Sequence, residues 1–202
     1  MRVSWLKSAV LGTFLLLAGC GGDKLSPLSE GATILAFGDS LTAGYGVDEA
    51  QSYPRVLAQL SGRRVVNAGV SGEVTAEGVA RLESLLDREQ PQLLILLEGG
   101  NDILRNLDPT ETRANLQRMI EQAQSRGVEV VLVGVPQKNL FSSTAPFYAE
   151  LAETYRLPFA DSLIAELLRS PGYKSDQVHF NAAGYRRLAE SIHELLKEEG
   201  AL

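Results

Sequence analysis

The sequence contains few of the side chains that hold metals or form disulfides. Its 202 residues include one cysteine and two histidines, His179 and His193. A single cysteine excludes an intramolecular disulfide, and zinc sites built on thiolates or histidines need several such ligands. We therefore expect no metal and no other cofactor in this protein.

Positive charge is also scarce. The chain has 19 Lys and Arg against 25 Asp and Glu, a formal net charge of −6. Because nucleic-acid binding requires neutralisation of phosphates, an acidic chain without a basic block excludes that class of partner. Hydrophobic residues make up 45% and charged residues 22%, which is typical of a globular protein and excludes disordered or polytopic membrane chains. The length suits one domain, which we expect to be monomeric.

The longest apolar run lies near the N-terminus. Arg2 and Lys7 are followed by an apolar stretch over residues 9–17, which has the length of a signal-peptide core and is short for a membrane span. The stretch ends in Leu-Ala-Gly-Cys at residues 17–20, which resembles the bacterial lipobox. We therefore expect residues 1–19 to be a lipoprotein signal peptide and Cys20 to be lipidated. An ordinary secretory signal and a retained membrane anchor are the alternatives.

The segment after Cys20 is polar and rich in Gly, Ser and Pro. This composition predicts a flexible tether over residues 20–31. Asp23 does not directly follow Cys20, the position where Asp retains enteric-type lipoproteins in the inner membrane. We therefore expect the protein in the bacterial cell envelope, lipid-anchored through Cys20 on the periplasmic face of the outer membrane.

Beyond the tether, short apolar runs alternate with helical patterns. Near-continuous apolar runs are typical of strands buried on both faces, and here they cover residues 32–37, 63–68, 93–97, 128–135 and 157–160. Helical periodicity covers residues 53–60, 75–88, 109–126, 146–155 and 162–169, and a final helix capped by Asn181. The alternation predicts an α/β domain over residues 32–202: a three-layer flavodoxin-like α/β/α sandwich with a central parallel sheet of about five strands.

Unusual residues follow these predicted strands. Gly-Asp-Ser-Leu occupies residues 38–41, Asn-Ala-Gly-Val-Ser-Gly residues 67–72 and Gly-Gly-Asn-Asp residues 99–102, and Asp-Gln-Val-His at 176–179 precedes the last helix. In open α/β sheets, ligands bind beyond the carboxyl ends of the strands. If the strand order begins 2-1-3, the loop that carries Ser40 lies between the other two.

These four blocks resemble the SGNH, or Gly-Asp-Ser-Leu, family of esterases and lipases. The four letters of the family name fall on Ser40, Gly72, Asn101 and His179. Residues 71–73 and 181–185 are most similar to the bacterial thioesterase, arylesterase and lysophospholipase type. The resemblance implies a cofactor-free serine esterase that works through an acyl-enzyme. Position 42 is Thr, so the Gly-x-Ser-x-Gly elbow of the α/β-hydrolases is missing at Ser40.

The resemblance also implies roles for individual residues. Ser40 is the expected nucleophile, which needs a base because a free hydroxyl is a weak nucleophile. His179 is the expected base, and Asp176 would orient it, with Asp161 as the substitute. The oxyanion hole would consist of the backbone N–H groups of Ser40 and Gly72 and the side-chain amide of Asn101.

Other residues near these blocks have plainer interpretations. Asp39, Asn67 and Asp102 are expected to brace their loops, and His193 to lie on a solvated flank of the last helix. Leu41, Tyr45, Leu140, Phe141 and Phe147 are candidate pocket residues, although packing of the neighbouring helix onto the sheet explains the later ones equally well.

The expected substrates are small-molecule or lipid esters: aryl esters, short or medium acyl esters, thioesters or lysophospholipids. A carbohydrate O-acetyl esterase and a non-catalytic envelope binding module on the same fold are the alternatives.

Overall fold

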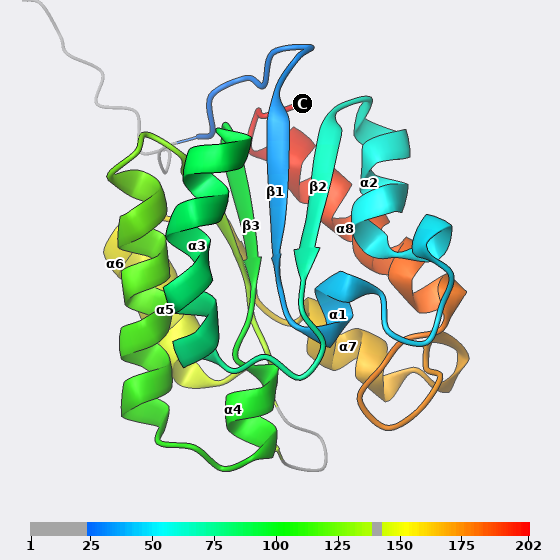
Figure 1. Ribbon diagram of the computed structural model, residues 1–202. Coiled ribbons are helices and arrows are strands. Elements are labelled where there is room, and N and C mark those ends of the chain that lie inside the picture. The colour runs from blue at the N-terminus through cyan, green and yellow to red at the C-terminus, as the bar shows by residue number, and fades with distance from the viewer. Residues whose placement is uncertain (1–23, 139–142) are drawn as a thin grey trace, which may run out of the picture.

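The computed structural model describes residues 24–138 and 143–202, which fold around one parallel sheet (Figure 1). The sheet has the order β2-β1-β3-β4-β5, and all of its pairings are parallel. Its strands are β1 (Thr33–Gly38), β2 (Arg64–Gly69), β3 (Leu93–Leu97), β4 (Glu129–Val133) and β5 (Phe159–Ala160). The predicted α/β class, the five strands and the 2-1-3 start of the strand order are confirmed.

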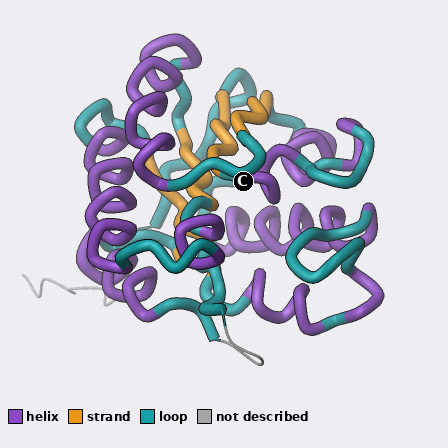
Figure 2. Tube along the Cα trace, turned by 60° about the horizontal axis from the view of Figure 1, so that its bottom comes forward, coloured by secondary structure: helices purple, strands orange, loops and turns teal. Residues whose placement is uncertain are grey.

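Helices cover both faces of the sheet, as Figures 1 and 2 show. On one side α2 (Tyr53–Ser61) packs against α8 (Ala182–Glu198). On the other side α3 (Thr75–Glu89) packs against α5 (Pro109–Gln124), which is followed by α6 (Pro146–Tyr155). The shorter helices are α1 (Ser40–Ala43), α4 (Gly100–Leu104) and α7 (Leu163–Arg169), with 3₁₀ turns η1 (Glu49–Gln51) and η2 (Pro171–Tyr173).

The sequence capping signals mark where the long helices begin. The Asp108 side chain accepts a hydrogen bond from the Thr110 N–H, and the Asn181 side chain accepts one from the Gly184 N–H. The end of α5 differs from the expected residue 126, because residues after Gln124 tighten into a turn that leads to Gly127, which has a φ of 71°.

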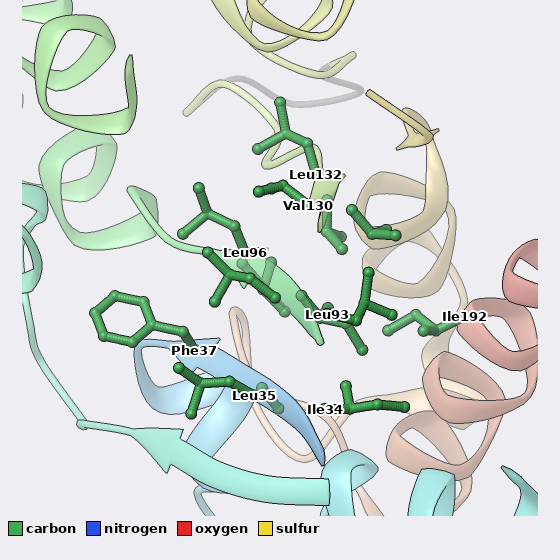
Figure 3. Close-up of a cluster of buried hydrophobic side chains, with 14 of the residues drawn as sticks. Ile34, Leu35, Phe37, Leu93, Leu96, Val130, Leu132 and Ile192 are labelled. Carbon is green, nitrogen blue, oxygen red and sulfur yellow. The ribbon is translucent and has the colours of Figure 1, made fainter. Parts of the chain in front are cut away.

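The centre of the core lies on the neighbouring strands β1 and β3. The side chains of residues 34–37 in β1 and of all five residues in β3 are buried. Figure 3 shows Ile34, Leu35, Phe37, Leu93 and Leu96 of these strands in one cluster with Val130, Leu132 and the α8 residue Ile192. β2 differs from the expectation of a strand buried on both faces. It lies at the sheet edge, so its residues are only half-buried or exposed.

One glycine lets the carboxyl ends of β1 and β3 approach each other. A Cβ atom on Gly38 would lie 1.9 Å from the Leu97 carbonyl oxygen and 2.5 Å from the Thr42 hydroxyl oxygen. No side chain fits there. Ser40, the first residue of α1, lies two residues after Gly38, at the carboxyl end of the strand between β2 and β3.

The described part of the expected tether is docked on the domain. Leu25 and Leu28 are buried, and their N–H groups donate to the carbonyl oxygens of Glu199 and Ala201 at 3.0 and 2.9 Å. The Ser26 N–H donates to the Glu129 carboxylate at 2.9 Å. Residues 25–28 therefore lie on the domain within the segment whose composition predicts a flexible tether, because two leucines in a polar stretch supply an apolar contact.

Cys20 and the predicted signal peptide lie outside the described residues. Within 24–138 and 143–202, no helix combines the length and the apolar character that crossing a bilayer requires.

Candidate active site

Ser40 is hydrogen-bonded in series with His179 and Asp176, which lie more than 130 residues later in the sequence, at the carboxyl end of the sheet. His179 Nε2 lies 3.0 Å from Ser40 Oγ, and His179 Nδ1 lies 2.8 Å from Asp176 Oδ2. Ser40 opens α1 directly after β1, and Asp176 and His179 come from the loop that leads into α8. Both distances are those of ordinary hydrogen bonds, so a proton can move between Ser40 and the imidazole.

The turn from Asp176 to His179 fixes the carboxylate. Asp176 Oδ1 accepts the backbone N–H groups of Val178 and His179, both at 2.8 Å, while Oδ2 faces the imidazole. Partial burial acts to raise the pKa of Asp176, but the hydrogen bonds from Val178 and His179 outweigh it and hold the pKa below its ordinary value. An ionised Asp176 favours the tautomer in which Nδ1 carries the proton and Nε2 can accept one.

Asp161, the substitute for Asp176, lies elsewhere. It lines a separate hollow with Ser162 and Glu166, and its backbone carbonyl accepts the Thr144 hydroxyl. His193 is half-buried on α8, and no hydrogen bond of the described residues involves its side chain. The structure thus brings one histidine and one aspartate to Ser40.

The three candidate oxyanion donors follow three neighbouring strands of the sheet, β1, β2 and β3. The N–H of Ser40 is in the first turn of α1, which supplies no intrahelical acceptor. Gly72 has a φ of 84°, and its carbonyl accepts Arg105 Nη2 at 2.7 Å. The Asn101 amide nitrogen donates one hydrogen to the Glu73 carbonyl at 2.8 Å, and its second hydrogen has no acceptor among the described residues.

The residues expected to brace the loops do so. Asp39 Oδ1 accepts the Leu41 N–H at 3.0 Å, and Asn67 Oδ1 accepts the Gly69 N–H at 3.0 Å. Asp102 accepts the N–H and the hydroxyl of Thr75, which joins the end of β3 to the start of α3. Burial raises the pKa of Asp39 to about 6, against the hydrogen bond from Leu41.

A buried ion pair beneath the site was not found from the sequence. Glu73 is buried and pairs with Arg81 of α3, whose guanidinium also donates to the Ala68 carbonyl at 2.9 Å and lies 4.0 Å from the centre of the Phe37 ring. The pair therefore holds the ends of β1 and β2 together. A sequence signal did exist, because position 81 shares the helix face of Gly78 and Leu85, where a charge requires a partner.

A pocket of about 580 Å³ opens beside Ser40, Asn101 and His179. Of the predicted pocket residues, Leu41 lines it. Tyr45 instead lies against His179, with ring centres 4.4 Å apart, and is 53% exposed. Phe147 packs on Tyr148, so the packing interpretation holds for it, and Leu140 and Phe141 lie outside the described residues.

The apolar lining that sequence reasoning missed comes from three other places in the chain. It consists of Ile103 and Leu104 of α4, Val135 after β4, and Ile164, Ala165 and Leu168 of α7. The described part of the chain holds no group of three His, Cys, Asp or Glu side chains arranged to bind a metal ion.

A serine, a histidine and an aspartate joined in this order at the carboxyl end of an α/β sheet are typical of the class of serine hydrolases. The family model described as GDSL-like Lipase/Acylhydrolase family matches residues 36–187, and the chain belongs to this family.

Named relatives agree with that assignment. The chain is 33% identical to Esterase TesA of Pseudomonas aeruginosa, over 91% of this chain and 97% of that protein. It is 29% identical to Thioesterase 1/protease 1/lysophospholipase L1 of Escherichia coli, over 74% of this chain and 76% of that one. The crystal structure of TesA superposes with a TM-score of 0.74 at 30% identity, covering 83% of this chain and 99% of that one. The protein is a serine ester hydrolase, which removes the non-catalytic binding module from the alternatives.

Proposed function

We propose that Ser40 is the nucleophile, that His179 is the general base and acid, and that Asp176 orients the imidazole. The observation that carries the proposal is the continuous series of hydrogen bonds, 3.0 Å from Ser40 Oγ to His179 Nε2 and 2.8 Å from His179 Nδ1 to Asp176 Oδ2. Among the described residues, His179 is the histidine whose ring lies within hydrogen-bond distance of a serine hydroxyl, since the side chain of His193 makes no hydrogen bond there.

The mechanism has two steps. Ser40 Oγ attacks the ester carbonyl carbon while His179 Nε2 takes the hydroxyl proton. The oxyanion is stabilised by the N–H groups of Ser40 and Gly72 and the free amide hydrogen of Asn101, and its collapse expels the alcohol or thiol, which receives the proton from His179. Water, deprotonated by His179, then hydrolyses the acyl-enzyme.

The substrates we propose are aryl esters, short or medium acyl esters, thioesters or lysophospholipids. The apolar wall formed by Ile103, Ile164 and Leu168 supports an acyl chain longer than acetyl. The relatives named as an esterase and as a thioesterase and lysophospholipase support the same range. A carbohydrate O-acetyl esterase remains the second candidate, and a higher kcat/KM for an acetyl than for an octanoyl ester would favour it.

The test uses residues 20–202 with Cys20→Ser, which prevents lipidation, and 4-nitrophenyl esters from acetate to palmitate. Turnover must fall to background in Ser40→Ala and persist in Ser125→Ala, a matched loss of an exposed hydroxyl at the end of α5. A serine-directed fluorophosphonate should label the protein that keeps Ser40, and should label it at Ser40 only. Equal turnover in the two variants would remove Ser40 from the mechanism.

We also propose that residues 1–19 are removed, that Cys20 is lipidated, and that the enzyme is held on the periplasmic face of the outer membrane. The lipobox-like sequence supports this. The first docked residue is Leu25, so residues 21–24 separate Cys20 from the domain. A Cys20→Ser precursor should move from the detergent phase to the aqueous phase on partition, and fractionation should place the wild type in outer-membrane vesicles. An unchanged partition would contradict the anchor.

A further inference from the structure

The pocket beside Ser40 carries the opposite charge to the chain as a whole. The protein has a net charge of −6, yet three cationic side chains line this pocket: Lys138, Arg169 and Lys174. They come from the loop after β4, the last residue of α7 and the loop before His179. Three separate segments therefore bring positive charge to one cavity.

None of the three cations is neutralised by a carboxylate of the described residues. Lys138 Nζ donates to the Leu104 carbonyl at 2.7 Å, so its ammonium lies along the pocket wall. Lys174 is half-buried. Its hydrogen bonds among the described residues are made by its backbone N–H and carbonyl, and none is made by its ammonium. Each ammonium or guanidinium thus keeps donors for a group that enters the pocket.

The negative charges near the pocket are already occupied. Asp39 is the one carboxylate among the lining residues, and it is buried behind the nucleophile with its oxygen on the Leu41 N–H. Asp176 is held by His179 and its own turn. Since a cleft lined by charge of one sign focuses its field, an anion is attracted to the open part of this pocket.

We infer that this pocket selects ester substrates that carry a negative group, a phosphate or a carboxylate, which Lys138, Arg169 and Lys174 bind while the ester carbonyl lies at Ser40. The inference rests on the proposed function of Ser40 and names the substrate class more narrowly. The apolar side chains between the cations and Ser40 accommodate the carbon chain that separates the anion from the ester.

Two pairs of esters test the inference and locate the anion. 4-Nitrophenyl hydrogen adipate against 4-nitrophenyl methyl adipate places the charge at the far end of the acyl group. 1-Octanoylglycerol 3-phosphate against 1-octanoylglycerol places it in the leaving alcohol. We expect a kcat/KM about tenfold higher for the anionic member of at least one pair at low salt, and a smaller ratio in high salt, which screens exposed charges.

The variant that tests the residues is Lys138→Gln/Arg169→Gln/Lys174→Gln. Its anionic-to-neutral ratio should fall to about one, because the attraction is removed. The matched control is Lys24→Gln/Arg55→Gln/Lys197→Gln, which removes the same charge from exposed positions away from the pocket and should keep the wild-type ratio. Lys174→Gln alone, with an intermediate ratio, serves if the triple variant does not fold.

Three results would overturn the inference. A wild-type ratio of one or less in both pairs, with good turnover of the neutral esters, contradicts it and leaves the proposed function intact. A high ratio that is equal in the triple variant and its control assigns the selectivity to other residues. Failure of all four esters together with no fluorophosphonate labelling of Ser40 contradicts the proposed function and the inference with it.

Discussion

The side-chain amide of Asn101 donates to the backbone carbonyl of Glu73 at 2.8 Å and so joins the end of β3 to the loop after β2. The Glu73 side chain in turn pairs with Arg81, which donates to the Ala68 carbonyl at the end of β2. One series of contacts thus sets the positions of the loops that carry Gly72 and Asn101, the two proposed oxyanion donors beside Ser40. The stability of the fold and the catalytic rate depend on the same few hydrogen bonds. Substitutions at Asn101 and Arg81 separate the two effects.

Asn101→Ala should lower kcat by ~10²–10³, because one oxyanion donor is lost. It should also lower the free energy of unfolding by ~1 kcal/mol, since the Glu73 carbonyl loses its partner. Steady-state kinetics and urea denaturation on the same preparation measure both effects. A loss of stability with full turnover would show that Asn101 acts only as a brace.

Arg81→Met should destabilise the protein by ~3–5 kcal/mol, because it leaves the Glu73 carboxylate, whose side chain is 4% exposed, buried without a partner. The double variant Arg81→Met/Glu73→Gln should recover most of that loss in urea denaturation, since no buried charge remains. If the double variant is no more stable than the single one, the ion pair is not the source of the effect, and packing of Arg81 on Phe37 is.

The stability of Asp39→Asn relative to wild type should depend on pH. Burial raises the pKa of Asp39 from 3.8 to about 6, so the folded state binds this proton more tightly than the unfolded state does. Ionisation of Asp39 therefore costs wild-type stability, and the cost develops as pH rises from about 4 to about 6. Asn keeps the acceptor for the Leu41 N–H but cannot ionise, so the variant should gain roughly 2 kcal/mol relative to wild type between pH 4 and pH 8.

Urea denaturation at both pH values measures that gain, and Asp48→Asn, an exposed aspartate before η1, is the matched control that should show none of it. A pH-independent difference between wild type and Asp39→Asn would place the Asp39 pKa at its ordinary value.

Leu25→Ser and Leu28→Ser should each lower the free energy of unfolding by ~1.5–3 kcal/mol, because each side chain is buried against the domain. Glu30→Ser, at an exposed position of the same segment, should change it little. Thermal unfolding of residues 20–202 measures all three. Three unchanged midpoints would restore the description of residues 24–31 as a free tether.

Local patterns in the sequence were sufficient for most of the fold. The apolar run at residues 93–97 coincides with β3, and helix α6 has the predicted bounds, because buried strands and capped amphipathic helices are encoded by neighbouring residues. β2 is the exception, since being an edge strand depends on sheet order, which the apolar run over 63–68 does not encode.

The residues that line the pocket could not be predicted from local sequence patterns. Its apolar wall comes from α4, the end of β4 and α7, and in each of these segments the residues in question look like ordinary core positions. Phe147 was a reasonable candidate from its place after β4, but its ring turns toward Tyr148. Which face of a short helix meets the cavity depends on how the helix packs, and no periodicity over seven residues specifies that.

By itself, the sequence determined the α/β class and the parallel sheet, and it placed Ser40, Gly72 and Asn101 at the ends of three strands, because these follow from hydrophobic runs and the turns that end them. Only the tertiary structure decided which groups meet: His179 at Ser40 across 139 positions of chain, Arg81 under Glu73, three cations around one pocket, and Leu25 against the C-terminal residues. The physical reason is that such contacts depend on how distant segments pack, and the loop closure they require is specified by the whole core and not by the residues that touch.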